Sequence, residues 1–258
     1  MNIFIVLGAV LIGLSLGLLG SGGSIITVPL LIYVADEPAK LAIAESLFIV
    51  GCISAFGSLS YVKRGLVNWK FVMLFGLPSM LGTYFGAWTS QFVSGEAQLL
   101  TFSIVMLIAS RSMFAPVTST NIAEPVPRNL LVIITGVLVG AIAGLVGVGG
   151  GFLIVPALFL LGKLAFQQAI GSSLIIITMQ SFIGYLKYQD VLEQFALTMN
   201  WKIVSVIIFM GILGSIIGVR IADKIPQQQI KKLFAIVLVV LGIYIFGTTI
   251  FDYFLNRS

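Results

Sequence analysis

Long apolar runs, separated only by short polar stretches, fill almost the whole of this 258-residue sequence. Apolar residues make up 59% of the chain and charged residues only 9%, whereas about 25% of an ordinary soluble domain is charged. A chain with so few charges cannot cover the surface of a water-soluble globule. Its basic excess lies between the apolar runs, where topology-setting charges are found, and forms no patch for nucleic acid. We therefore predict an all-α polytopic membrane protein that sits in a lipid bilayer and has no nucleic-acid partner.

Two amino-acid counts restrict the chemistry. The sequence has no histidine, which excludes His-based acid–base catalysis and the ligation of haem, zinc or iron by His. Its single cysteine, Cys52, lies in an apolar run, so neither an internal disulfide nor a thiolate cluster is available. We expect no metal site, no cofactor and no catalytic residues.

The apolar runs predict about ten helical segments, most of them close to the ~20 residues that cross a bilayer. The expected ranges are 3–19, 24–35, 41–60, 70–90, 97–115, 129–147, 150–162, 168–187, 200–222 and 230–251. The second and the seventh segments are too short to cross unaided, which leaves open whether they are re-entrant or part of a full crossing. Three prolines between 115 and 128 stop any helix there. We divide the chain into a first membrane repeat (1–115), a linker (116–128) and a second membrane repeat (129–258).

The two halves resemble each other in an ordered series of matches. Gly17 to Pro29 aligns with Gly144 to Pro156 at a spacing of 127, and this register continues to Tyr61 and Tyr188. The spacing then becomes 132, which pairs Asn68-Trp-Lys with Asn200-Trp-Lys. Such a series indicates duplication. Because residues 3–19 have a counterpart at 129–147, we expect the first segment to be retained and not to be a signal peptide.

The basic residues favour inverted halves. With five segments per half and the 61–70 loop inside, ten Lys and Arg residues lie inside and four outside. The ten are Lys63, Arg64, Lys70, Arg111, Arg128, Lys163, Arg220, Lys224, Lys231 and Lys232. Parallel halves divide the same residues eight to six, which is the poorer asymmetry. We predict two inverted five-segment repeats in the cell inner (plasma) membrane, with both termini outside.

Two glycine clusters interrupt the apolar sequence at equivalent places and are our candidate substrate-binding elements. Glycine permits the positive φ angles of a sharp turn and a close approach of ligand to backbone. A short helix then begins, either near the glycines or at Pro29 and Pro156, and its free N–H groups suit an anion. The candidates are Gly20, Ser21, Gly22, Gly23 and Ser24 in the first half, and Gly147, Gly149, Gly150 and Gly151 in the second. The alternative is that the glycines only permit tight helix packing, as the fourfold spacing of Gly136, Gly140 and Gly144 suggests elsewhere.

Polar residues within the apolar runs supply further candidates. Glu45 is either a protonatable group that couples proton movement to transport or a carboxylate at shallow depth near Lys40. Ser46, Ser172 and Ser173 have hydroxyls that can donate to an anion, although hydroxyls often bond back to their own helix. Gln180 and Ser181 lie deeper in the eighth segment and are weaker candidates.

These motifs resemble the TauE/SafE sulfite exporter family. The resemblance rests on the duplicated Gly-x-Gly-Gly-(Gly/Ser)-x4-Pro break, on Gln168-Ala-Ile-Gly-Ser-Ser-Leu174, and on the Gly82-x3-Gly86 and Gly214-x3-Gly218 pairs. It implies export or uptake of sulfite, organosulfonates or related small anions, driven in some cases by protons. The first half departs from the pattern, since Ala44-Glu45-Ser46 stands where the second half has Gly171-Ser172-Ser173.

We therefore expect a secondary transporter that moves a small sulfur-containing oxyanion, such as sulfite or a sulfonate, by alternating access between the two repeats. A non-transporting membrane scaffold or assembly factor is the alternative. An intramembrane enzyme is disfavoured, because neither a His base nor paired carboxylates are present. The sequence does not decide which anion is carried, the direction of transport, the coupling ion, or whether the chain forms homo-oligomers.

Overall fold

The computed structural model describes residues 3–21, 23–114, 129–147, 149–162, 164–222 and 227–255. Within these ranges the chain is helical and contains no strand. The first half comprises α1 (Ile3–Leu19), α2 (Gly23–Tyr33), α3 (Ala39–Lys63), α4 (Trp69–Phe71), the π-helical turn η1 (Val72–Gly76), α5 (Leu77–Thr89), the 3-10 turn η2 (Ser90–Phe92) and α6 (Gly95–Phe114). The second half comprises α7 (Asn129–Val146), α8 (Gly151–Gly162), α9 (Phe166–Gln194), α10 (Trp201–Ala222) and α11 (Gln227–Leu255). The predicted all-α class is confirmed; the predicted linker 116–128 lies outside the described residues.

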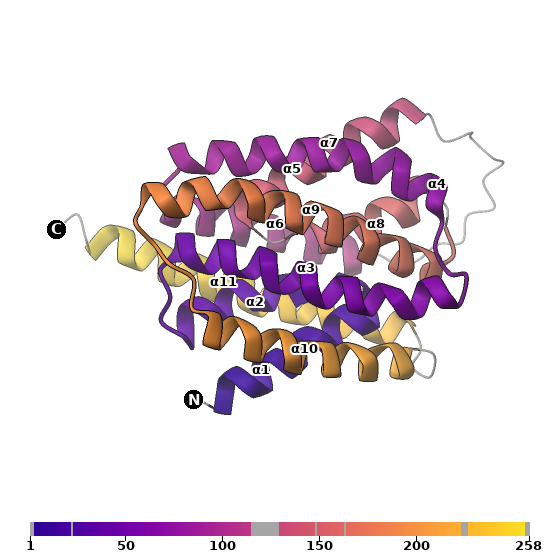
Figure 1. Ribbon diagram of the computed structural model, residues 1–258, viewed down its shortest axis with the longest axis horizontal. Coiled ribbons are helices and arrows are strands. Elements are labelled where there is room, and N and C mark those ends of the chain that lie inside the picture. Colours follow the sequence, from indigo (N-terminus) through magenta and orange to yellow (C-terminus); the bar gives the residue numbers. More distant parts are fainter. Residues whose placement is uncertain are drawn as a thin grey trace.

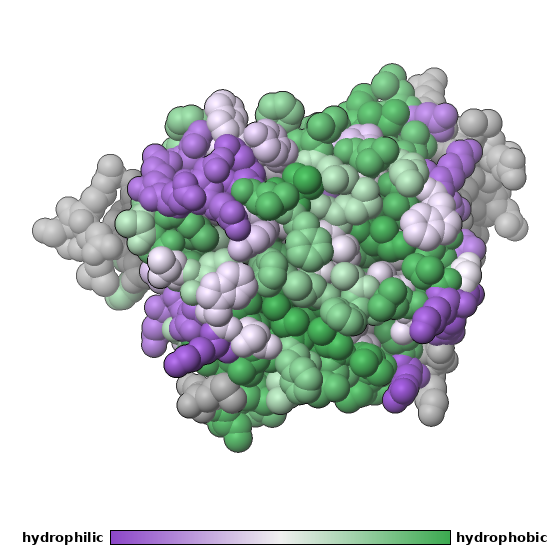
Figure 2. Space-filling view, viewed as in Figure 1, coloured by the Kyte–Doolittle hydropathy of each residue, from purple (hydrophilic) through white to green (hydrophobic). Residues whose placement is uncertain are grey.

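Five stretches among the described residues are long and apolar enough to cross a membrane: Ala39–Lys63, Trp69–Phe92, Asn129–Val146, Gln167–Gln194 and Trp201–Ala222. Large apolar side chains on their outer faces are exposed, as a lipid environment requires. Figure 2 shows hydrophobic residues across the middle of the molecule and hydrophilic residues gathered toward its two ends. This distribution matches a hydrocarbon band between two polar faces, and the multi-pass prediction is confirmed.

The two halves exchange equivalent contacts. The first helix of each half packs along the fourth segment of the other, so that α1 lies against α10 and α7 lies against α5. Glycines mediate both contacts in the same way. A Cβ placed on Gly13 would lie 1.9 Å from the carbonyl oxygen of Gly211, and a Cβ on Gly140 would lie 2.0 Å from that of Ser79. The halves are therefore related by an approximate two-fold axis.

That axis lies across the helices and not along them. At the centre, α3 and α9 run side by side (Figure 1), with Leu47 against Gly184 and Gly51 against Ser181. Residue numbers rise along α3 as the numbers of the contacting residues on α9 fall, so the two helices are antiparallel. A two-fold axis that relates antiparallel membrane helices must be perpendicular to them, in the plane of the membrane. This geometry is the predicted inverted repeat.

The short helices α2 and α8 have 11 and 12 residues. In the first half, α2 turns back along α1, since Gly23 packs on Leu16 and Gly8 packs on Leu30. Of the two starting points that the sequence allows, the structure has the first: α2 begins at Gly23 and α8 at Gly151, while Pro29 lies inside α2. Each short helix therefore begins within the protein, directly after its glycine break.

Candidate functional site

Four glycines of the two breaks adopt backbone angles that favour glycine. Gly20 has φ 65° and Gly147 φ 76°, at equivalent positions in the repeat, and Gly149 and Gly150 have φ 62° and 65°. The turn between α1 and α2 and the turn between α7 and α8 are thus built in the same way. Gly22 and the side chain of Ser24 lie outside the described part of the chain.

The structure brings the two breaks together. A Cβ on Gly151 would lie 3.0 Å from Cα of Ser21, so the start of α8 touches the turn that precedes α2. The first N–H groups of a helix have no partner within it, and its N-terminus carries about half a positive charge. Two such ends that converge between inverted halves form a region suited to negative charge. The glycines are also closely packed: Gly20 meets Ile170 and Gly147 meets Ile43. Ligand contact and packing are therefore both compatible with these positions.

The matched serines link the halves. Ser46 Oγ donates to the carbonyl oxygen of Gly147 at 2.5 Å, and Ser173 Oγ donates to that of Gly20 at 2.9 Å. Each hydroxyl also approaches a carbonyl one turn back on its own helix, at Ile43 (2.9 Å) and at Ile170 (2.8 Å). In this conformation both hydroxyls hold the opposite glycine break in place.

Glu45 and Ser172 occupy equivalent positions and make equivalent bonds elsewhere. Glu45 Oε1 accepts from the backbone N–H of Asn200 at 2.7 Å, and Ser172 Oγ accepts from the backbone N–H of Asn68 at 2.9 Å. Asn200, the partner of Glu45 in the first half, precedes α10 in the second half. Asn68, the partner of Ser172 in the second half, precedes α4 in the first half. The two side chains therefore join the halves near the starts of α4 and α10, and their bonding atoms point to these loops.

Gln180 and Ser181, the weaker candidates from the sequence, lie beside the second glycine break. Gln180 Oε1 lies 3.0 Å from the position of a Cβ on Gly150, and Ser181 Oγ lies 2.6 Å from that of a Cβ on Gly149. Both side chains are fully buried, and among the described residues neither the amide of Gln180 nor the hydroxyl of Ser181 has a hydrogen-bond partner. The sequence feature that points to these residues is a pair of polar side chains at the middle of a long apolar run. Polar side chains within a membrane cost free energy and commonly mark functional sites.

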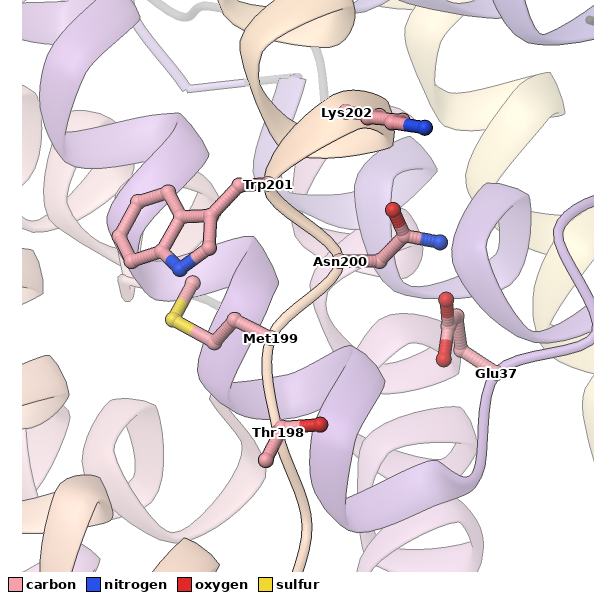
Figure 3. Close-up of a pocket in the computed structure, with 6 residues that line it drawn as sticks. All are labelled: Glu37, Thr198, Met199, Asn200, Trp201 and Lys202. Carbon is pink, nitrogen blue, oxygen red and sulfur yellow. The ribbon is translucent and has the colours of Figure 1, made fainter.

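A cavity of about 570 Å³ lies at the loop that leads into α10 (Figure 3). It is lined by Glu37, Thr198, Met199, Asn200, Trp201 and Lys202. Figure 3 shows the side chains of Glu37 and Asn200 on the same side of the loop, and those of Met199 and Trp201 together on the other. Because Glu45 accepts from the N–H of Asn200, this cavity lies beside the carboxylate that joins α3 to α10. In the part of the chain that the structure describes, no group of three acidic or Cys side chains is placed to hold a metal ion.

Known sequences resemble the chain over nearly all of its length. The family described as "Sulfite exporter TauE/SafE" matches residues 5–245. The chain belongs to this family. Three relatives of the TauE/SafE chain are each named a "Probable membrane transporter protein". The one from Xylella fastidiosa is 30% identical, covering 91% of both chains. The one from Methanocaldococcus jannaschii is 25% identical, covering 91% of this chain and 93% of its own.

The third relative, YunE of Bacillus subtilis, is 26% identical over 97% of this chain and 98% of its own. No solved structure matches the chain. Family, names and apolar helices together identify a multi-pass membrane transporter, in agreement with the resemblance that the glycine motifs indicated.

Proposed function

We propose that this protein is a secondary transporter that moves a small sulfur-containing oxyanion, such as sulfite or a sulfonate, by alternating access between its inverted halves. The observation that carries the proposal is the convergence of two helix starts, α2 and α8, at the contact between Ser21 and Gly151. Discontinuous helices that meet near the midplane of inverted repeats are the usual binding site of secondary transporters. The family description, which names sulfite export, supports the substrate class.

The charge distribution favours backbone recognition. Among the described residues, the buried charged side chains are Lys40 and Glu45, both in the first turns of α3. Lys40 Nζ donates to the carbonyl oxygens of Ser90 and Val93, so its ammonium group is already engaged. An anion between the halves would then be held by N–H groups of Gly23, Gly149, Gly150 and Gly151 and by hydroxyls. The candidates for those hydroxyls remain Ser21, Ser24, Ser46, Ser172 and Ser173.

The links between the halves support alternating access. Asn200 bonds to Glu45 near one end of α3, and Asn68 bonds to Ser172 near the opposite end of the α3–α9 pair. In an inverted repeat these two links are exchanged by the axis, so rocking that opens one can leave the other closed. The halves would rotate about the anion between them.

Proton coupling is assigned to Glu45. The variant Glu45→Gln keeps an acceptor oxygen for the N–H of Asn200 but cannot exchange a proton at neutral pH. If Glu45 couples protons, the variant transports the anion at a rate independent of an imposed proton gradient. Glu96→Gln, at the first turn of α6, is the matched control and retains the dependence. A gradient response in Glu45→Gln equal to wild type would leave Glu45 as a structural acceptor only.

The test of the proposal is flux of sulfite and sulfonates into liposomes that contain the purified protein. We expect uptake above that of protein-free liposomes, with competition among anions of the panel. No flux for any of them, under either direction of proton gradient, would overturn the proposal. That result would favour a membrane scaffold, in which the close approaches of Gly13 and Gly140 only pack helices.

A further inference from the structure

Gln180 is a buried polar residue at the centre of the molecule. It lies midway along α9 (Phe166–Gln194), next to the contact between Ser181 and Gly51 at which α9 and α3 cross. Its side chain is fully buried, and neither Oε1 nor Nε2 has a hydrogen-bond partner in the part of the chain that the structure describes. An amide in such a place is costly, because it has lost its bonds to water and gained none. A ligand that bonds to the amide would remove this cost.

The amide is directed at the second glycine break. Gln180 Oε1 lies 3.0 Å from the position of a Cβ on Gly150, directly before α8 begins at Gly151. The hydroxyl of the neighbouring Ser181, which has no hydrogen-bond partner among the described residues, lies 2.6 Å from the position of a Cβ on Gly149. A helix start, an amide and a hydroxyl thus meet at one point, and all three have hydrogen-bonding capacity left over.

The first half lacks this amide. The repeat spacing of 127 pairs Gln180 with Ile53 and Ser181 with Ser54. Ile53 is buried against the backbone of α10, where its Cδ1 lies 2.3 Å from the position of a Cβ on Gly211. The two sides of the approximate axis therefore differ at its centre, and a ligand there meets an amide on one side only.

We propose that Gln180 and Ser181, with the break Gly149–Gly151, form the specificity-determining side of the substrate site, and that the substrate is a singly charged oxyanion carrying its own hydrogen-bond donor. This inference rests on the proposed function. Two helix starts supply about one positive charge together, which balances one negative charge and not two. The amide Nε2 donates to an anionic oxygen, and Oε1 requires a donor from the ligand. Hydrogensulfite and hydroxysulfonates have this chemistry, whereas sulfite dianion and sulfate do not.

The test measures ligand binding to the purified full-length protein in detergent at one pH. Two sulfonates of the same charge and similar size are compared, 2-hydroxyethanesulfonate and ethanesulfonate, with sulfate as the dianion. For wild type we expect 2-hydroxyethanesulfonate to bind about tenfold more tightly than ethanesulfonate, the ratio that one additional hydrogen bond gives. Sulfate should bind more weakly than either.

Gln180→Met keeps the length of the side chain and removes the amide. We expect this variant to lose the preference between the two sulfonates and to bind both about tenfold to a hundredfold more weakly. Its melting temperature without ligand should equal or exceed that of wild type, because an unpaired buried amide has been removed. Ser181→Ala should weaken binding, whereas the repeat-equivalent Ser54→Ala should leave it unchanged.

The outcomes separate the two claims. If wild type binds anions and Gln180→Met binds them equally well with the same preference, the inference is wrong and the proposed function stands. If wild type prefers sulfate, the ligand class is wrong. If wild type binds no anion of the panel and shows no flux, the proposed function fails and the inference fails with it.

Discussion

Replacing Gly140 by Ala tests whether the helix-packing glycines fix the distance between the halves. A Cβ at this position would lie 2.0 Å from the carbonyl oxygen of Ser79 and 2.9 Å from its Cα. Real Cβ atoms do not approach other atoms closer than 3.0 Å, and the obstructing atoms are backbone, so no side-chain rotation relieves the contact. Helices α5 and α7 must therefore move apart by about 1 Å, which forfeits up to half of the dispersion attraction across the contact.

The free energy of unfolding should fall by about 2 kcal/mol. Overpacking costs ~1–3 kcal/mol, and we expect the upper end because backbone meets backbone, while Ala in place of Gly returns ~1 kcal/mol of helix propensity. For a chain of this size that loss lowers the melting temperature by roughly 4–8 °C. Thermal unfolding of the purified protein in detergent measures it.

The matched control is Gly247→Ala in α11, where a Cβ would meet no atom of the described residues within 4 Å. That variant gains helix propensity without a clash and should melt at or slightly above the wild-type temperature. If Gly140→Ala also melts at or above wild type, the close approach of α5 and α7 does not hold the halves together and the reasoning is refuted.

Three further predictions concern the links between the halves and their orientation. Ser173→Ala removes the hydroxyl that bonds to the carbonyl of Gly20 and should lower the unfolding free energy by ~1 kcal/mol, measured by thermal unfolding. Tyr188→Phe removes a buried hydroxyl that bonds to the carbonyl oxygen of Leu145 and to the side chain of Gln98, and should cost ~1 kcal/mol in the same assay, because Gln98 Nε2 still donates to that carbonyl. In a Cys52→Ala background, a membrane-impermeant maleimide should label Gln194→Cys on intact cells and Lys63→Cys only after permeabilisation.

The two stability predictions each have a control variant. Ser15→Ala removes an exposed hydroxyl that bonds only one turn back on α1, and it should leave the melting temperature unchanged. Tyr84→Phe changes an exposed tyrosine and should also leave the melting temperature unchanged. A loss in either control as large as in the test variant would show that the assay reports general damage. Labelling of Lys63→Cys on intact cells would place the 61–70 loop outside and contradict the predicted orientation of the chain.

The fold could be predicted in detail because the length of each apolar run determines the extent of a helix. The internal repeat then relates the helices of one half to those of the other. Nine of the ten segment ranges agree with the helices to within four residues at each end, and α9 extends seven residues beyond its predicted end at 187. The inverted relation followed from counting basic residues, and the antiparallel crossing of α3 and α9 supports it independently. The sequence does not determine where α2 begins, because Gly23 and Pro29 both suit a helix start.

The candidate site was less predictable, because contacts between the halves depend on which face each helix turns inward. No sequence pattern pairs Ser46 with the carbonyl of Gly147, or Glu45 with the N–H of Asn200. Gln180 is a weak candidate from the sequence for the same reason: without the crossing of α3 and α9, a glutamine in an apolar run has no known neighbour. Only the packed structure places its unpaired amide at the break that contains Gly150.

Anion flux through the wild-type protein in liposomes tests the central claim most directly. Proteoliposomes loaded with buffer are placed in sulfite at a pH where hydrogensulfite is present, and the internal sulfur oxyanion is measured over time. The account predicts saturable uptake above that of empty liposomes, with competition by 2-hydroxyethanesulfonate and a lower rate in Gln180→Met. Uptake equal to that of empty liposomes, for every anion and every imposed gradient, would contradict it.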